Sequence, residues 1–346
     1  MISEPNSNPL PLVSIGVPVY NGERFLSQTL QSLQNQDYGN LELIICDNGS
    51  SDRTPTICQE HQSSDHRIHY YRNATNMGAI QNFNRAFEVG QGTYFMWAGA
   101  HDLWAESYVS RCTSILERDP TVVLAYSRTM LIDLEGNPID VMPDQIDTRG
   151  MTTPVRYAHL IRNLRWCNMI HGVIRRESLY QTRLFKKVFG TDHLLLAELS
   201  LNGAFAQIPE PLFFRRQTRP DENIDRDPDG WKQQMIVTLD PGSKSKWGKT
   251  KLTDLYRTLR NEHIKLIQSS SLNHIAKLRM LLETFRCYQS IFGVDWPGGP
   301  LLRKLWTNRI SDSLLRRIAG LCMKNQRITL LCATSVFSVS LWFTIA

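Results

Sequence analysis

Apolar positions follow two patterns along the first third of the chain, one typical of buried strands and one typical of helices. Short apolar runs rich in branched side chains predict buried strands over residues 12–19, 41–46, 68–72, 93–98 and 122–127. Between them, apolar residues recur at helical spacing and predict helices over residues 23–34, 54–61, 78 to about 89, and 105–118. A regular alternation of strand and helix predicts a parallel sheet with right-handed crossovers.

The rest of the chain keeps this mixed character and then becomes helical. A turn-rich hairpin is expected around residues 133–138, and an apolar helix over 194–201 leads to a closing strand near 211–216. Residues 218–230 are rich in Asp and Pro, which predicts a linker or loop. The periodicity of residues 251–292 indicates amphipathic helices.

Charge divides the chain into unequal parts. Residues 243–328 carry 17 Lys and Arg against 5 Asp and Glu, whereas the remainder carries 22 against 28. This asymmetry indicates that the C-terminal part faces an anionic partner such as a membrane surface or a lipid phosphate. No nucleic-acid motif or aromatic stacking pattern accompanies the charge, so nucleic acid is not an expected partner.

The last 19 residues, 328–346, contain no charged side chain. That length just reaches across a bilayer core of about 30 Å, and it is equally compatible with a buried helix or an oligomer contact. We therefore expect three parts. They are a domain over residues 1–220, a basic helical extension over 221–327, and an apolar segment over 328–346 that is a candidate for membrane association.

Cysteine usage and the first residues bear on the compartment. Seven cysteines are scattered without a C-x-x-C pair, which argues against a disulfide framework and indicates a reducing compartment. The first eleven residues are polar and lack the apolar stretch of a secretory signal. We expect a cytoplasmic protein that is peripheral to the inner membrane face or anchored there by its C-terminus.

Polar clusters follow each of the first four predicted strands. They occupy residues 18–22, 47–52, 72–78 and 99–102. In open parallel sheets the ligand lies beyond the carboxyl ends of the strands. The sequence therefore predicts a binding site where these clusters meet.

Two of these segments resemble a known family. Residues 13–22 read VSIGVPVYNG and residues 43–54 read LIICDNGSSDRT, with NMG at 76–78 and WAGAHD at 97–102. This combination resembles family 2 glycosyltransferases over roughly residues 12–216. The resemblance implies an α/β fold of the GT-A type, Rossmann-like with a mostly parallel central sheet, to which a C-terminal helical extension is added. It also implies a nucleoside-diphosphate sugar as donor.

The resemblance assigns the nucleotide to residues matching Pro18, Tyr20, Asp47 and Asp52. A carboxylate at a strand end, such as Asp47, suits the N–H groups of a base edge. Turn formation and helix capping are the alternatives for both acids, and the Ser51-Asp52-x-Thr54 pattern suits a cap well. Further nucleotide-binding candidates are Asn21, Asn48, Arg72, Asn76 and Gly78. The last three lie at a strand end and the following helix start. Backbone N–H groups there suit a diphosphate, and the alternative is a simple turn.

The segment Ala100-His101-Asp102 departs from the family pattern, which has acidic residues at or near these positions. Asp102 matches the direct metal ligand, which implies a divalent cation, Mn²⁺ or Mg²⁺, against the diphosphate. His101 is a candidate to join the metal shell, to contact a phosphate, or merely to pack.

Asp192 in the segment 190–193 matches the family's base catalyst, and its alternative is the N-cap of the helix over 194–201. A single base implies inversion at the anomeric carbon. The resemblance places His171 and Gly172 on the acceptor side. The pair Arg215 and Arg216 either offsets the diphosphate charge or is a solvated basic pair.

The sequence thus predicts an inverting, metal-dependent, hexosyltransferase-like glycosyltransferase acting on a glycan or lipid-linked acceptor in cell-surface polysaccharide synthesis. The alternative is a catalytically impaired nucleotide-sugar-binding protein of the same fold, because His101 replaces an acid. A nucleotidyltransferase is disfavoured, since residues 18–23 do not form a Gly-rich, Lys-bearing loop.

Overall fold

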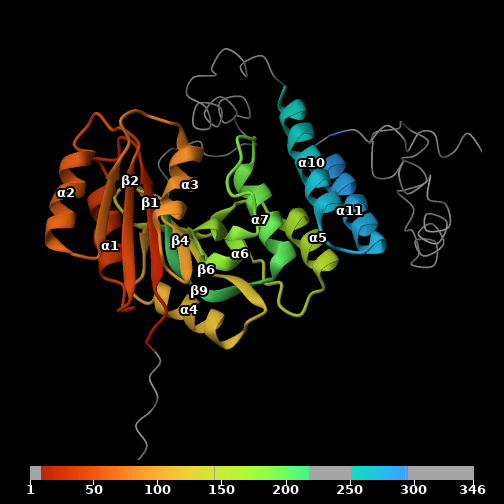
Figure 1. Ribbon diagram of the computed structural model, residues 1–346, viewed down its shortest axis with the longest axis horizontal. Helices are drawn as coiled ribbons and strands as arrows, with labels where there is room; N and C mark the ends of the chain where they lie inside the picture. The colour runs from red at the N-terminus through yellow and green to blue at the C-terminus, as the bar shows by residue number, and fades with distance from the viewer. Residues whose placement is uncertain (1–8, 144, 218–250, 293, 295–346) are drawn as a thin grey trace, which may run out of the picture.

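The computed structural model describes residues 9–143, 145–217, 251–292 and 294. The strands in these residues are β1 (Val13–Val19), β2 (Leu41–Asp47), β3 (Ile68–Arg72), β4 (Tyr94–Trp97), β5 (Leu103–Trp104), β6 (Val122–Ile132), β7 (Pro138–Val141), β8 (Val173–Arg175) and β9 (Ala204–Arg216). They form one sheet in the order β3-β2-β1-β4-β8-β6-β9-β5, and β7 pairs with β6 at the side (Figure 1).

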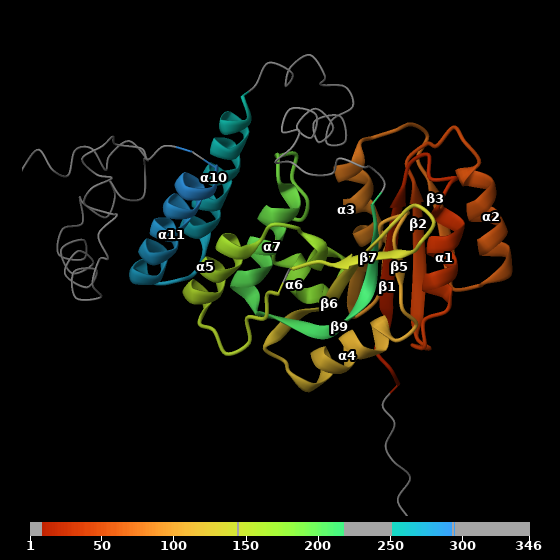
Figure 2. The same ribbon diagram turned by 180° about the vertical axis from the view of Figure 1, so that it is seen from behind.

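Helices cover both faces of this sheet. They are α1 (Leu26–Gln34), α2 (Thr54–Ser64), α3 (Ala79–Val89), α4 (Tyr108–Arg118), α5 (Thr153–Asn163), α6 (Arg176–Tyr180), α7 (Thr191–Asn202), α10 (Leu252–Ser269) and α11 (His274–Phe292), with a short 3₁₀ helix η1 (Asn168–His171). One hydrophobic core lies under α1, α2 and α4, and a second lies under α3, α5, α6 and α7. The molecule is therefore a three-layer α/β structure (Figure 2).

The half of the sheet that contains β3, β2, β1 and β4 is parallel, as the alternation of strand and helix predicts. Every residue of β1 is buried, which fits a strand with helices on both faces. Gly16 is required there, since an added Cβ would lie 2.8 Å from the Phe95 ring and 2.9 Å from Ala86 Cβ. In this register Val19 pairs with Asp47, and Asp47 pairs with Arg72, so the polar strand ends share one edge.

The other half of the sheet is mixed and was only partly predicted. The short β8 is antiparallel to both β4 and β6, whereas β6 and β9 are parallel. Strands β6 and β9 are longer than predicted, because they pair with each other along most of their length. The two-residue β5, which pairs with β9, was not predicted.

The predicted helices in residues 251–292 are α10 and α11. They pack on α5 and α7 through a shared apolar cluster that includes Tyr157, Ala197, Ile267 and Met280 (Figure 1). The predicted linker at 218–230 and the apolar segment at 328–346 lie outside the described residues, so the three-part division stays a prediction. Among the helices that the structure describes, none combines the length and apolarity needed to span a bilayer.

Candidate functional site

Asp47 is a fully buried carboxylate at the carboxyl end of β2. Its Oδ1 accepts a 2.8 Å hydrogen bond from the Ser50 amide, and its Oδ2 accepts one of 2.8 Å from the Tyr70 hydroxyl. Arg72 Nε lies 3.4 Å from the same Oδ2. Burial, and then the bond to Asp47, raise the pKa of Tyr70, so this hydroxyl keeps its proton and donates. The carboxylate is held in one orientation at the sheet edge.

Asn48 joins the loop after β2 to the loop after β3. Its Oδ1 accepts hydrogen bonds of 2.9 Å from the Asn73 amide group and from the Met77 backbone, while its Nδ2 donates to Asn76 Oδ1 at 2.8 Å. Asn76 Oδ1 also accepts from the Gly78 amide at 2.8 Å. Gly78 has a φ of +87°, which favours glycine, and no side chain of the described residues caps α3 after it. The first amides of α3 are therefore open to an anionic group.

The turn after β1 carries the predicted Pro18, Tyr20 and Asn21. Pro18 lies within β1 and pairs with Cys46, and the Tyr20 side chain is half exposed. Asn21, with a φ of +50°, accepts a 2.9 Å hydrogen bond from the Ser51 amide. Tyr20 therefore presents an exposed aromatic ring at the carboxyl edge of the sheet, next to the loop after β2.

Asp52 braces two segments of backbone. Its Oδ1 accepts from the Thr54 amide and its Oδ2 from the Glu23 amide, each at 3.0 Å. Burial opposes ionisation of Asp52, but the bonds from Thr54 and Glu23 outweigh it and lower the pKa. The N-cap of α2 is Arg53, and among the described residues no side chain caps this helix, so the alternative that Asp52 is its cap is wrong. The nucleotide contact of Asp52 stays a prediction.

Asp102 lies in the turn after β4 and is 2% exposed. Its Oδ1 accepts a 2.9 Å hydrogen bond from the Arg216 amide, and His101 Nε2 lies 3.7 Å from that oxygen. An added Cβ on Gly99 would lie 2.6 Å from Asp102 Oδ2, so a larger residue at position 99 would displace the carboxylate. No hydrogen bond from the described residues reaches Oδ2. The structure thus brings the two predicted metal ligands together, with one carboxylate oxygen unused.

The described residues contain no cluster of three or more His, Cys, Asp or Glu suited to a metal ion. The protein donors at this place are therefore a carboxylate oxygen of Asp102 and the half-exposed imidazole of His101. Two such donors fit a Mn²⁺ or Mg²⁺ ion that completes its shell with phosphate oxygens and water.

Arg216 is buried and its guanidinium is committed to the protein. It donates to the carbonyl oxygens of His101 and Leu134 and to Gln28 Oε1, at 2.9, 2.6 and 2.9 Å. Arg216 therefore braces the turn that carries Asp102. The guanidinium of its neighbour Arg215 lies over the Trp166 ring, 5.2 Å from its centroid. The alternative of a solvated pair is wrong for Arg216, which is 1% exposed. The role of this pair at a diphosphate stays a prediction.

His171 lies beside the same turn, since its Nδ1 is 2.9 Å from the carbonyl oxygen of Trp97 at the end of β4. A carbonyl only accepts, so Nδ1 carries the proton. Burial, aided by His101 and Arg215 and opposed by Asp102, lowers the pKa of His171. The neutral ring therefore keeps an acceptor lone pair on Nε2. An added Cβ on the next residue, Gly172, would lie 2.7 Å from the Ala125 carbonyl oxygen, so this position has no room for a side chain.

Asp192 lies in the first turn of α7 and is partly exposed. The N-cap of this helix is Gly190, with a φ of +69°, so the alternative that Asp192 is the N-cap is wrong. The helix begins three residues earlier than predicted, because Gly190 supplies the left-handed conformation that turns the chain into α7. Figures 1 and 2 show the start of α7 at the same end of the molecule as the carboxyl ends of β1 and β2.

Several residues of this region were not singled out from the sequence. Trp104 stacks on Phe213, with 5.2 Å between ring centroids, and Phe213 lies 5.3 Å from the His171 ring. Trp104 and Phe213 belong to β5 and β9, which meet only in the folded sheet. No local pattern marks such a contact.

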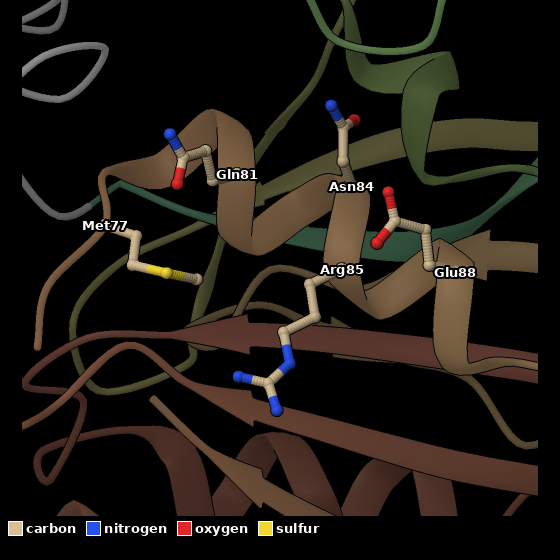
Figure 3. A pocket seen from close by; sticks show the side chains of 5 residues that line it. All are labelled: Met77, Gln81, Asn84, Arg85 and Glu88. Carbon is tan, nitrogen blue, oxygen red and sulfur yellow. The ribbon is translucent and has the colours of Figure 1, made fainter. Parts of the chain in front are cut away.

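A pocket of about 460 Å³ runs along α3 beside the turn of residues 76–78. It is lined by Met77, Gln81, Asn84, Arg85 and Glu88 (Figure 3). The lining does not include any of the four predicted site carboxylates, Asp47, Asp52, Asp102 and Asp192. Asn84 also exchanges two hydrogen bonds with the backbone of Phe185, which ties α3 to the loop before α7.

Comparison with known structures supports the fold. The chain is similar to S. aureus TarS, residues 1–349 in complex with UDP-GlcNAc, with a TM-score of 0.60 and 15% sequence identity over 81% of this chain and 73% of that chain. At this identity the likeness concerns the fold alone. The predicted GT-A fold, with a curled and mostly parallel central sheet, is confirmed.

Proteins with similar sequences are glycosyltransferases. An uncharacterized glycosyltransferase of Haemophilus influenzae is 28% identical over 58% of this chain and 64% of its own length. The putative teichuronic acid biosynthesis glycosyltransferase TuaG of Bacillus subtilis is 29% identical over 38% of this chain and 51% of its own length. The chain thus spans less than two thirds of these relatives. The model of the family "Glycosyl transferase family 2" matches residues 14–189, about half of the chain, and this chain belongs to that family.

Proposed function

We propose that this protein transfers a sugar from a nucleoside-diphosphate donor to a glycan or lipid-linked acceptor, with inversion, in the synthesis of a cell-surface polysaccharide. One observation carries the proposal. Asp47 and Asp102 follow β2 and β4, the two parallel strands that flank β1, and so come to one edge of the sheet. Family membership and the similarity to TuaG support the reaction class and the kind of product.

The nucleotide end of the site is formed by the loops after β1, β2 and β3. The exposed ring of Tyr20 offers a stacking surface for a base. We propose that the buried carboxylate of Asp47 accepts from a base N–H group in addition to the bonds from Ser50 and Tyr70. The uncapped start of α3 at Gly78 suits the diphosphate. UDP-GlcNAc is the first donor to test, because the TarS structure holds it.

The diphosphate end is formed by the turn after β4. Asp102 and His101 would hold the Mn²⁺ or Mg²⁺ ion, which offsets the charge of the departing nucleoside diphosphate when bound. His171 lies on the side of this turn where the sugar acceptor binds. Its neutral ring offers the Nε2 lone pair to a hydrogen-bond donor.

Asp192 is the proposed base that takes the proton of the acceptor hydroxyl. The hydroxyl oxygen then bonds to the anomeric carbon as the bond to the diphosphate breaks on the opposite face, which inverts the configuration. The placement of Asp192 in the first turn of α7 supports this role, since the carboxylate is partly exposed and, among the residues that the structure describes, accepts only the local bond from the His193 amide.

The test begins with thermal shifts of the full chain in UDP-, GDP- and dTDP-sugars with and without Mn²⁺. Transfer or hydrolysis of the stabilising donor is then compared between the native chain and Asp192→Asn. Turnover that is lost in Asp192→Asn supports the enzyme. Stabilisation by a sugar nucleotide without turnover in either protein would instead support a catalytically impaired nucleotide-sugar-binding protein.

A further inference from the structure

A chain of buried polar side chains starts at the residue after the proposed base. His193 Nδ1 on α7 lies 3.3 Å from His263 Nε2 on α10, and His263 Nδ1 lies 2.9 Å from the Tyr157 hydroxyl on α5. That hydroxyl lies 2.9 Å from Thr284 Oγ1 on α11. His193 is 7% exposed and the other three are fully buried. Four helices therefore meet through one line of hydrogen bonds.

The direction of these hydrogen bonds follows from their far end. Thr284 Oγ1 donates to the Met280 carbonyl oxygen at 2.8 Å, so it accepts from Tyr157. Tyr157 then accepts from Nδ1–H of His263, and His263 Nε2 accepts from Nδ1–H of His193. Both histidines are neutral in this arrangement, and each ring is held in one tautomer and orientation.

The loop before α7 is tied to α10 by ion pairs. Glu262 Oε2 accepts hydrogen bonds from Arg183 at 2.9 Å and from Lys186 at 2.7 Å. Arg183 also donates to the buried Glu198 within α7 at 2.6 Å. Lys186 is joined to the helix start, since its amide donates to Thr191 Oγ1 at 2.8 Å.

The N-cap of α7 also rests on α10. An added Cβ on Gly190 would lie 2.7 Å from Leu259 Cδ2, so the two helices are in close contact there. Leu259, Glu262 and His263 occupy neighbouring positions on one side of α10. Together they hold the residues immediately before and after Asp192.

We propose that His263 and Glu262 are positioning residues for Asp192, and that α10 is a structural part of the active site. This inference rests on the proposed function. A base must be placed within about 1 Å of its productive position, and a misplacement of that size costs up to about 100-fold in rate. Directional hydrogen bonds fix the rotation of α7 more tightly than an apolar contact of the same size would. This is a physical reason for polar side chains, rather than apolar ones, between the four helices.

The variants are His263→Leu, which removes both hydrogen bonds, and His263→Gln, which keeps an amide able to accept from His193. Tyr157→Phe and Glu262→Gln are milder changes in case His263→Leu fails to fold. Asp254→Asn is the matched control, because Asp254 lies on the same helix in an exposed pair with Arg257. All are made in the full chain.

Hydrogen–deuterium exchange of residues 183–195, with residues 41–52 as internal reference, tests the anchoring without any donor. We expect about tenfold faster exchange of this segment alone in His263→Leu and Glu262→Gln. In turnover with the donor found above, starting from UDP-GlcNAc, kcat should fall about tenfold or more with an unchanged donor KM. His263→Gln should restore part of kcat, and Asp254→Asn should match the native chain.

Unchanged exchange of residues 183–195 would overturn the inference, and so would faster exchange with a native kcat. A parallel loss of kcat, donor affinity and melting temperature would show general destabilisation and would also overturn it. Full turnover in Asp192→Asn is a separate result, since it contradicts the base in the proposed function and leaves the exchange result standing.

Discussion

The backbone amide of Arg216 donates a 2.9 Å hydrogen bond to Oδ1 of Asp102, and its guanidinium holds the carbonyl oxygen of the preceding residue, His101. One residue at the end of β9 thus fixes both the carboxylate and the backbone of the turn after β4. The proposed cation site therefore depends on a strand that lies more than 100 residues away in the sequence.

Arg216→Met should destabilise the protein by about 2 kcal/mol or more, because it removes a buried guanidinium that donates to the carbonyl oxygens of His101 and Leu134 and to Gln28 Oε1. Urea unfolding measures the change. The control is Arg111→Gln, which breaks an exposed pair with Glu210 and should cost less than about 0.5 kcal/mol. Equal, small effects of the two changes would contradict a bracing role for Arg216.

Asp102→Asn should abolish the Mn²⁺-dependent part of the thermal shift by a sugar nucleotide, because the unused Oδ2 loses its charge. The metal-independent part should remain, since Asp47 and Asn48 are untouched. His101→Asp should strengthen Mn²⁺ binding, as it adds a second carboxylate beside Asp102. Titration calorimetry with Mn²⁺ in the presence of UDP checks both, and native behaviour of Asp102→Asn would place the cation elsewhere.

Acid should destabilise the protein through the buried histidine pair. Burial lowers the pKa of His193 from 6.5 to about 4, against the attraction of Asp192. Burial also holds the pKa of His263 well below its usual value, with His193 and Arg183 adding to the effect. The unfolded chain therefore binds more protons than the folded chain between about pH 6.5 and 4. The free energy of unfolding should fall as pH drops through this range, by up to about 1.4 kcal/mol per pH unit for each histidine.

Urea unfolding at several pH values between 7.5 and 4.5 measures this slope. His193→Asn should flatten it, whereas His69→Asn, at a half-exposed histidine, should not. An identical slope in His193→Asn would mean that other groups dominate the acid response.

The membrane prediction rests on residues outside the described part of the chain. Removal of residues 296–346 should move the protein from the membrane fraction to the soluble fraction, because this change deletes the apolar segment and part of the basic charge. Fractionation of cells expressing the full and shortened chains is the measurement. A full chain found only in the soluble fraction would refute the prediction.

The candidate site was partly predictable. The strand ends carry Asp47, Asn48, His101 and Asp102. Strand ends in a parallel sheet share an edge, so local pattern was enough to predict that edge as their common location. Asp52 and Asp192 show the limit of such reasoning. Capping and catalysis favour the same residue type at a helix start, and only the backbone angles showed that Gly190, not Asp192, is the N-cap.

By itself, the sequence determined the alternation of strands and helices, the parallel half of the sheet and the membership in a glycosyltransferase family. These features depend on periodicity and on motifs within a few residues of each other. Only the tertiary structure decided the insertion of β8 between β4 and β6, the brace from Arg216 to Asp102 and the anchoring of α7 by α10. These are contacts between distant segments, and their partners are selected by packing, burial and hydrogen-bond geometry that no local pattern records.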